Sequence, residues 1–161
     1  MFKLFKKNVK QDTVVAPGSG QLMPITSVSD AMFSQKIMGD GYAVKPNTDD
    51  IVSPVSGTVV SVFPTKHALS LKADNGLEIL LHLGVDTVDL KGEPFNITVT
   101  DGQHVDAGQS LGTMNRAMIA DAGLDDVMII VFTNMDAIAK MPEFTDSTVS
   151  AGSEIGQVTL N

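Results

Sequence analysis

The chain has 161 residues, of which 43% are hydrophobic, with a formal net charge of −8 and no cysteine. Such a length can bury most of the surface that the unfolded chain exposes, and it needs no second domain. The acidic balance argues against nucleic acid as a partner and favours partners with basic docking faces. A chain without cysteine forms no disulfide or zinc-thiolate site, which fits a cytoplasmic protein. The longest apolar run, residues 127–132, is far shorter than the ~20 residues of a membrane-spanning helix.

Residues 1–10 are basic, and Phe2, Phe5 and Val9 fall on one face if the segment is helical. The segment can touch an anionic membrane surface peripherally, or it can be a solvated and frayed terminus. The second interpretation is favoured because so short a helix is marginal in water. We therefore expect residues 1–12 to be a flexible basic amphipathic segment and residues 13–161 to be a single domain.

Two sequence patterns each occur twice. Residues 15–22 and 52–59 share V-[AS]-P-x-S-G-x-[LV], and residues 105–112 and 149–156 share V-x-A-G-x-x-[LI]-G. Each pattern reads as the end of a strand followed by a turn that contains glycine. The duplications therefore indicate an all-β unit built from similar hairpins.

A short helical turn is expected after the first repeat. Ser29 or Asp30 can cap it, and residues 39–41 force a loop behind it. Apolar side chains are unusually dense around this turn: Met32, Phe33, Ile37 and Met38. They form either part of the core or an exposed docking patch, and periodicity alone favours the core.

The middle of the chain predicts a β-hairpin that carries two of the three histidines. Apolar runs at 68–71 and 77–83 flank Asp74-Asn75-Gly76, a composition typical of a tight turn. His67 and His82 lie near the end of the hairpin that is far from this turn.

Two registers of the hairpin bring the histidines together. A four-residue loop, Ala73 to Gly76, sets His67 opposite His82, whereas a two-residue loop sets His67 opposite Gly84 with His82 diagonally beside it. Both registers place the imidazoles on one face of the sheet. A slip by one residue would separate them and turn the apolar set outward.

The later elements are short. Residues 91–95 predict a turn, 96–100 a short strand, 115–122 a short helix, 127–133 a buried strand, and 155–160 a strand that closes the sheet. With 14 glycines and 7 prolines, the expected fold is an antiparallel β-sandwich or partly open barrel, with duplicated hairpins and a few short helical turns.

Several motifs carry a family resemblance. They are FPTKHA at 63–68, GLEILLHLGVDTV at 76–88, DAMF at 30–33, KIMGDG at 36–41, KGEPF at 91–95 and TNMD at 133–136. In this order they resemble the glucose-type enzyme IIA domain of the bacterial phosphoenolpyruvate-dependent sugar phosphotransferase system. The likeness runs from about Val15 to the carboxyl end, but residues 115–126 show little of it.

The resemblance implies a phosphocarrier centred on the histidine pair. His82 matches the phosphorylated nucleophile, and His67 matches the neighbouring group that stabilises the phosphoryl group. Thr65 is expected to hydrogen-bond a ring nitrogen and fix its tautomer. A neutral imidazole near pH 7 can carry a phosphoryl group. No cofactor is required, although the family allows a zinc ion at a partner interface on His67 and His82.

The implied partners are HPr, which donates the phosphoryl group, and the IIB domain of a sugar permease, whose cysteine accepts it. The sugar is glucose or a related one, and other transporters or kinases are candidates for regulatory binding. Asp30 and Asp86 are expected to bind basic groups of the partners. The candidate apolar collar around the site consists of Phe33, Ile37, Met38, Phe63, Leu69, Leu80 and Val88, some of which must be core instead.

Other readings stay open from the residues alone. A histidine pair across two strands also fits a satisfied polar pair or half of a metal site, so the alternative is a zinc-binding hydrolase or a metal-dependent interaction module using His67 and His82. A biotinyl or lipoyl carrier fits the duplicated hairpins but needs a lysine at a hairpin tip, and the clearest tip is Asp74-Asn75-Gly76. His104 is expected to be a solvated loop residue without a role.

Overall fold

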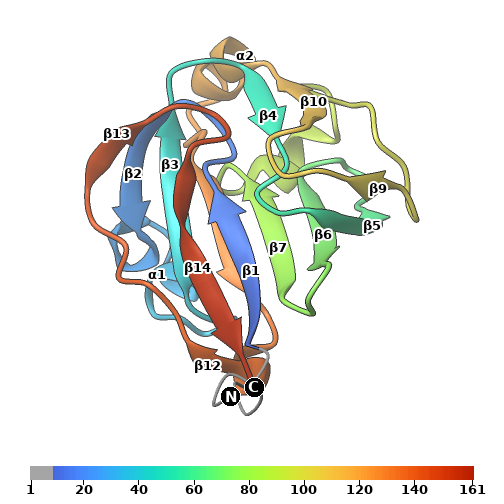
Figure 1. Ribbon diagram of the computed structural model, residues 1–161. Helices are drawn as coiled ribbons and strands as arrows, with labels where there is room; N and C mark the ends of the chain where they lie inside the picture. The colour runs from blue at the N-terminus through green and yellow to red at the C-terminus, as the bar shows by residue number, and fades with distance from the viewer. Residues whose placement is uncertain (1–8) are drawn as a thin grey trace, which may run out of the picture.

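The computed structural model describes residues 9–161, and antiparallel strands dominate it (Figure 1). The large sheet has eight strands. In order across it they are β13 (Ser147–Val149), β2 (Gly20–Pro24), β3 (Gly41–Pro46), β11 (Met128–Phe132), β7 (Glu78–Leu83), β6 (Ala68–Ala73), β5 (Gly57–Val62) and β9 (His104–Val105). The predicted all-β class is confirmed, and the sheets do not close into a barrel within the described residues.

Two further sheets have three strands each. One contains β1 (Lys10–Val15), β14 (Glu154–Leu160) and β12 (Ile138–Lys140), and the other contains β4 (Asp50–Val52), β10 (Ser110–Met114) and β8 (Phe95–Ile97). In Figure 1, β1 and β14 lie in front of the large sheet, and β4 and β10 lie near its upper end. Side chains from both small sheets join one face of the large sheet in the main core, so the architecture is a sandwich.

The short helices occur where the sequence predicts them. Asp30 caps α1 (Ala31–Ser34), since its Oδ1 accepts a hydrogen bond from the Met32 amide at 2.8 Å. Asn115 caps α2 (Arg116–Asp121) in the same way. Among residues 9–161 there are also the 3-10 turns η2 (Ile25–Ser27), η3 (Thr87–Leu90) and η4 (Met135–Ala137).

The amino-terminal boundary lies earlier than predicted. β1 begins at Lys10 and pairs with β14, so residues 10–12 belong to a sheet rather than to a flexible segment. Asp12 is buried, and its two carboxylate oxygens accept from the amides of Asn75 and Leu77 at 3.0 Å each. This carboxylate ties the turn of the histidine hairpin to β1. The amphipathic face predicted for residues 1–10 falls mostly outside the described residues.

The two copies of the first repeated motif contact each other reciprocally. The Val15 amide donates to the Pro54 carbonyl at 2.9 Å, and the Val52 amide donates to the Pro17 carbonyl at 2.8 Å. The strand order of the large sheet is also symmetrical about the central β11–β7 pair. The chain therefore folds as two similar halves related by an approximate two-fold axis, and the predicted duplication of hairpins is confirmed.

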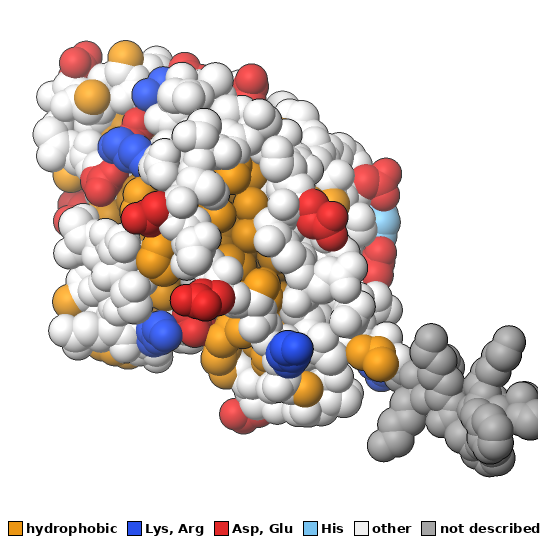
Figure 2. All heavy atoms as spheres, turned by 60° about the vertical axis from the view of Figure 1, so that its left-hand side comes forward, with side chains coloured by type: hydrophobic (Ala, Val, Ile, Leu, Met, Phe, Trp, Pro, Cys, Tyr) orange, Lys and Arg blue, Asp and Glu red, His pale blue; other side chains and the backbone are white. Residues whose placement is uncertain are grey.

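Both faces of the large sheet bury apolar side chains. The main core lies against the small sheets, and a smaller core covers the opposite face beneath η2 and α1. The smaller core consists of Ile25, Val28, Phe33, Ala43, Ala68, Leu80, Val127, Ile129 and Val131. On the side that carries β13 and β2, apolar atoms lie recessed between scattered acidic and basic groups (Figure 2).

The register of the histidine hairpin differs from both predicted registers. Ala68 pairs with His82 and Leu69 pairs with Leu81, around a loop formed by residues 74–76. This register places Leu69 and Leu81 on one face, in the main core. This register is shifted by one residue from each predicted register. The shift does not turn apolar residues outward, because the smaller core covers the other face of the sheet, where Leu80 lies.

Candidate functional site

His82 stands on the face of β7 that carries the smaller core. Its cross-strand neighbour on β11 is Ile129, which is fully buried. The ring of Phe33, from α1, packs against the His82 ring with 5.0 Å between centroids. Apolar groups therefore surround the imidazole on several sides and leave it half-buried.

One hydrogen bond fixes the proton of the His82 ring. Its Nδ1 lies 2.6 Å from the carbonyl oxygen of Gly84. Because a carbonyl can only accept, Nδ1 must carry the proton, and Nε2 keeps its lone pair. A neutral His82 therefore has a nucleophilic Nε2.

The contact between His67 and His82 is not explained by the regular alternation of side chains along a strand. In the observed register, a regular strand would send the His67 side chain to the face opposite His82. His67 instead lies in a bend just before β6. It follows Lys66, whose φ of 57° lies in the left-handed region, which is uncommon for a residue other than glycine. The two rings meet with centroids 5.1 Å apart and planes at 80°. The predicted convergence is present, although the register predicted to cause it is wrong.

Thr65 and Phe63 hold the ring of His67 from its other sides. Thr65 Oγ1 lies within hydrogen-bond distance of His67 Nδ1, as the sequence predicts. The ring of Phe63 meets the imidazole edge-on, at 5.6 Å between centroids. The side chain of His67 is 8% exposed. When the threonine hydroxyl donates to Nδ1, the His67 Nε2 carries the proton and is a hydrogen-bond donor.

Burial lowers the pKa of both histidines. For His82, desolvation is the main cause, and the neighbouring His67 lowers its pKa further. The Gly84 carbonyl, Asp30 and Asp86 raise the pKa of His82 but do not reverse its direction. For His67, desolvation alone lowers the pKa. Both rings are therefore neutral at pH 7, as a histidine nucleophile requires.

The residues predicted to contact partners fall into two groups. Ile37, Met38 and Val88 are exposed by 64%, 39% and 44%, Asp86 is exposed, and Asp30 is half-buried. A second group is buried or partly buried beneath the site: Phe33, Phe63, Leu69 and Leu80. Phe33 and Leu80 belong to the smaller core and Leu69 to the main core, so the expectation that some collar residues are core is confirmed. Contact of Phe33, Phe63 and Leu80 with partners stays a prediction. These side chains support the histidines from below.

Other candidates lie away from this site. His104 is exposed on β9, where its Nε2 lies 3.1 Å from Asp74 Oδ1. Among residues 9–161, no group of three or more His, Cys, Asp or Glu side chains is arranged to hold a metal ion. In the same part of the chain, no helix is both long and apolar enough to span a bilayer.

Sequence reasoning missed the role of Gly84. Its φ is +82°, and its carbonyl accepts the Nδ1 hydrogen of His82. A glycine two positions after a histidine at a strand end is the only signal in the sequence, and it does not identify a hydrogen-bond acceptor. Sequence reasoning also missed the charged network around Asp125 and Asp126, which is described below.

The fold and the histidine pair can now be compared with known proteins. The family described as "phosphoenolpyruvate-dependent sugar phosphotransferase system, EIIA 1" matches residues 12–138. The chain belongs to this family. Components of this kind transfer phosphoryl groups in sugar transport, so the chain is a phosphotransferase component and the family resemblance seen in the sequence is confirmed.

Relatives from several bacteria support the assignment. The chain is 40% identical to "PTS system glucose-specific EIIA component" of Oceanobacillus iheyensis, covering 94% of this chain and 92% of that protein. It is 40% identical to the protein of the same name from Staphylococcus aureus, covering 99% and 98%. It is also 44% identical to "PTS system glucose-specific EIICBA component" of Streptococcus pneumoniae, but spans only 20% of that protein and 92% of its own length.

A solved structure has the same fold. Glucose permease IIA from Mycoplasma capricolum matches with a TM-score of 0.81 and 34% sequence identity, covering 95% of this chain and 97% of that one. A match over so much of both EIIA chains supports the sandwich architecture of the whole described region.

Proposed function

We propose that His82 accepts a phosphoryl group from the phosphohistidine of HPr and passes it to the cysteine of the IIB domain of a sugar permease. The observation that carries the proposal is the hydrogen bond from His82 Nδ1 to the Gly84 carbonyl, which leaves Nε2 free beside a second imidazole. Glucose is the proposed sugar because relatives that match over nearly their whole length are named glucose-specific. The cytoplasm is the proposed compartment, where both partners present their reactive groups.

In the accepting step, the Nε2 lone pair of His82 forms a bond to phosphorus while the phosphorus–nitrogen bond of phospho-HPr breaks. The His82 ring becomes cationic and keeps its Nδ1 proton, which the Gly84 carbonyl continues to accept. In the donating step, the thiolate of the IIB cysteine attacks phosphorus, the phosphorus–Nε2 bond breaks, and the neutral ring returns. Neither step needs a metal ion.

His67 is proposed to stabilise the phosphoryl group in both steps. With Thr65 donating to its Nδ1, the Nε2 hydrogen of His67 is free to bind a phosphoryl oxygen. Phosphoryl transfer depends mainly on such positioned donors, because the charge spreads over the equatorial oxygens. The two carboxylates near His82, on Asp30 and Asp86, favour the cationic ring of the phosphorylated state.

The proposed docking surface comprises the exposed side chains around the pair. Ile37, Met38 and Val88 offer apolar contacts, and Asp30 and Asp86 offer acidic ones to basic partner faces. The same surface is available to regulated transporters or kinases. A zinc ion held by His67 and His82 would need further ligands from a partner, and this stands as the alternative.

Intact-protein mass spectrometry tests the proposal. The chain is incubated with phosphoenolpyruvate, enzyme I and HPr, with and without a chelator, beside His82→Ala. We expect one acid-labile phosphoryl group on the wild type in both conditions and none on the variant. Labelling of His82→Ala would contradict the assigned nucleophile. A wild type that stays unlabelled with competent partners would contradict the phosphocarrier and direct attention to bound zinc.

A further inference from the structure

Gly84, whose carbonyl fixes the His82 ring, is itself held by a neighbouring segment. The Gly84 amide donates to the Val127 carbonyl at 2.7 Å, and the Val85 amide donates to the Asp125 carbonyl at 3.0 Å. The packing is tight, because a Cβ on Gly84 would lie 2.7 Å from the Asp125 carbonyl oxygen. The direction of the Gly84 carbonyl therefore depends on where residues 125–127 lie.

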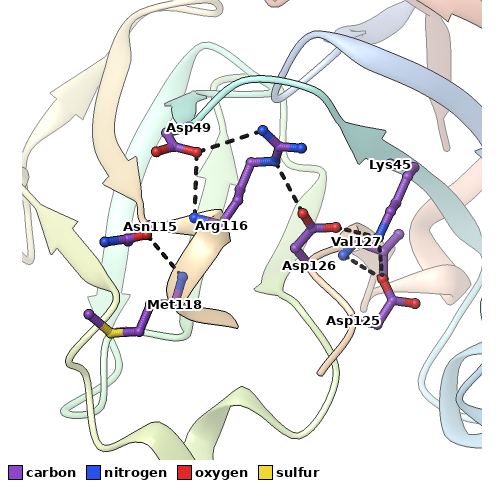
Figure 3. A network of polar contacts seen from close by, with 8 residues as sticks. All are labelled: Lys45, Asp49, Asn115, Arg116, Met118, Asp125, Asp126 and Val127. Atoms are coloured by element: carbon purple, nitrogen blue, oxygen red, sulfur yellow. Dashed lines mark hydrogen bonds and ion pairs between the residues drawn. The ribbon is translucent and has the colours of Figure 1, made fainter. Parts of the chain in front are cut away.

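A charged network holds residues 125–127 in turn, as Figure 3 shows. Asp126 is 7% exposed, and each of its carboxylate oxygens is bound by a different cation. Lys45 Nζ from β3 donates to Oδ1, and Arg116 Nε from α2 donates to Oδ2 at 3.1 Å. A buried carboxylate with a cation on each oxygen has a fixed orientation, because charge-assisted bonds are directional.

The neighbouring carboxylate completes the network. Asp125 Oδ1 accepts from Lys45 Nζ at 3.1 Å and from the Val127 amide at 3.0 Å. Arg116 is anchored at its far side by Asp49, whose Oδ1 lies 3.9 Å from Arg116 Nη1. Three elements distant in sequence, β3, α2 and the start of β11, are thus joined at the segment that holds Gly84.

We propose that Asp126 is a positioning residue for phosphoryl transfer at His82. Bound by Lys45 and Arg116, it fixes residues 125–127, and these fix the Gly84 carbonyl that keeps the proton on His82 Nδ1. The consequence for phosphoryl transfer rests on the function proposed above, but the consequence for the His82 tautomer does not. Arg116 and Asp126 of the network lie within residues 115–126, which show little of the family resemblance.

The matched test compares Asp126→Asn with Asp74→Asn. Both remove the charge of one carboxylate that contacts a nitrogen-bearing side chain, but Asp74 contacts His104 at the far end of the hairpin. Nitrogen-15 NMR of the histidine rings reports the His82 tautomer in the unphosphorylated chain. We expect Asp126→Asn to move population from the Nδ1-protonated to the Nε2-protonated ring, and Asp74→Asn to leave the wild-type ratio.

The second readout is the rate of phosphoryl acceptance from phospho-HPr. We expect Asp126→Asn to lower it by about tenfold, the lower end of the effect seen when hydrogen-bond partners that orient metal-bound histidines are removed. Asp74→Asn should match the wild type. A folded Asp126→Asn chain with an unchanged His82 tautomer overturns the proposal, even if its stability falls.

Lys45→Met keeps the test decisive if Asp126→Asn does not fold. The Lys45 side chain is 51% exposed, so the variant loses the cation while retaining most of its packing. We expect the same change of tautomer, smaller in size because Arg116 still holds Asp126. An unchanged tautomer in Lys45→Met would overturn the proposal in that case. If the wild type accepts no phosphoryl group, the proposed function fails, while the tautomer measurement still decides the role of Asp126.

Discussion

The two halves of the large sheet share one backbone frame but carry different chemistry. At the start of β6, Ala68 pairs with His82; at the start of β3, Gly41 pairs with Val131. Asp40, the residue before Gly41, is therefore the counterpart of His67, the residue before Ala68. The backbone repeats the match, since the Leu83 amide donates to the His67 carbonyl at 2.7 Å and the Phe132 amide donates to the Asp40 carbonyl at 2.8 Å.

The difference between the halves lies in a few side chains and one glycine. The position of His82 is taken by Val131 in the other half, and that of His67 by Asp40. The position of Gly84 is taken by Thr133. The Thr133 amide donates to the Glu78 carbonyl at 2.9 Å, and the Gly84 amide makes the matching hydrogen bond to the Val127 carbonyl. The backbone frame is therefore repeated at both places, but only one place has two imidazoles in contact and a glycine carbonyl that orients the ring of His82.

The largest expected effect is on phosphoryl acceptance, and it compares substitutions at matching positions of the two halves. His82→Ala should abolish phosphoryl acceptance, because no other imidazole stands at this position. Val131→Ala, at the matching position, should still accept after a loss of stability of about 2 kcal/mol from the cavity it leaves. Intact mass and chemical denaturation measure both variants at a temperature where each is folded. Loss of acceptance in a folded Val131→Ala would show that the halves are not functionally distinct.

Gly84→Ala should have the next largest effect. Its φ of +82° strains alanine, and the new Cβ would lie 2.5 Å from Thr87 Cγ2. Gly102→Ala is the matched control, since its φ is +87° but, apart from its chain neighbours, no residue in the range 9–161 has a heavy atom within 4 Å of the added Cβ. We expect Gly102→Ala to lower the free energy of unfolding by about 1–2 kcal/mol from backbone strain alone. Gly84→Ala should lose more and also slow phosphoryl acceptance; equal losses of stability would contradict the tight packing of Gly84 against residues 125–127.

Much of the fold could be predicted because its signals are local. The repeated motifs, the candidate cap Asp30, the short helix over residues 115–122 and the apolar run of β11 all lie within short stretches, and the structure confirms them. The predicted domain boundary at residue 13 is too late because Lys10 and Gln11 are polar strand residues whose partners lie in β14, far along the chain. Pairing over such a distance leaves no local pattern.

The candidate site was predicted in its residues but not in its geometry. The spacing of His67 and His82 indicated a pair, yet the argument assumed regular alternation through a residue that lies in a bend after the left-handed Lys66. The network of Lys45, Arg116 and Asp126 could not be foreseen, since its members come from separate elements that only the tertiary fold brings together. Exposed and buried apolar residues of the collar were indistinguishable for the same reason.

His67→Ala should have a smaller effect than His82→Ala, because the nucleophile remains. We expect acceptance from phospho-HPr to stay largely intact and transfer to the IIB cysteine to slow, since the phosphoryl group loses a donor. Thr65→Val should act in the same direction but less, because it removes only the hydrogen bond that orients the His67 ring. Single-turnover kinetics of the two half-reactions measures this. Equal rates of onward transfer in the wild type and in His67→Ala would remove the supporting role of His67.

The smallest expected effect concerns protonation. Burial lowers the pKa of His82 in the folded chain below its usual value of 6.5, so the unfolded chain binds the proton more readily. The free energy of unfolding should therefore fall as the pH drops below that value, and this part of the pH dependence should disappear in His82→Gln. Asp86→Asn should lower the pKa of His82 further, because the carboxylate raises it. Proton NMR titration of the ring measures the pKa. A pKa of His82 above 6.5 in the wild type would contradict a desolvated site. It would also weaken the comparison of the two halves, in which a half-buried imidazole in one half stands where the other half has the buried Val131.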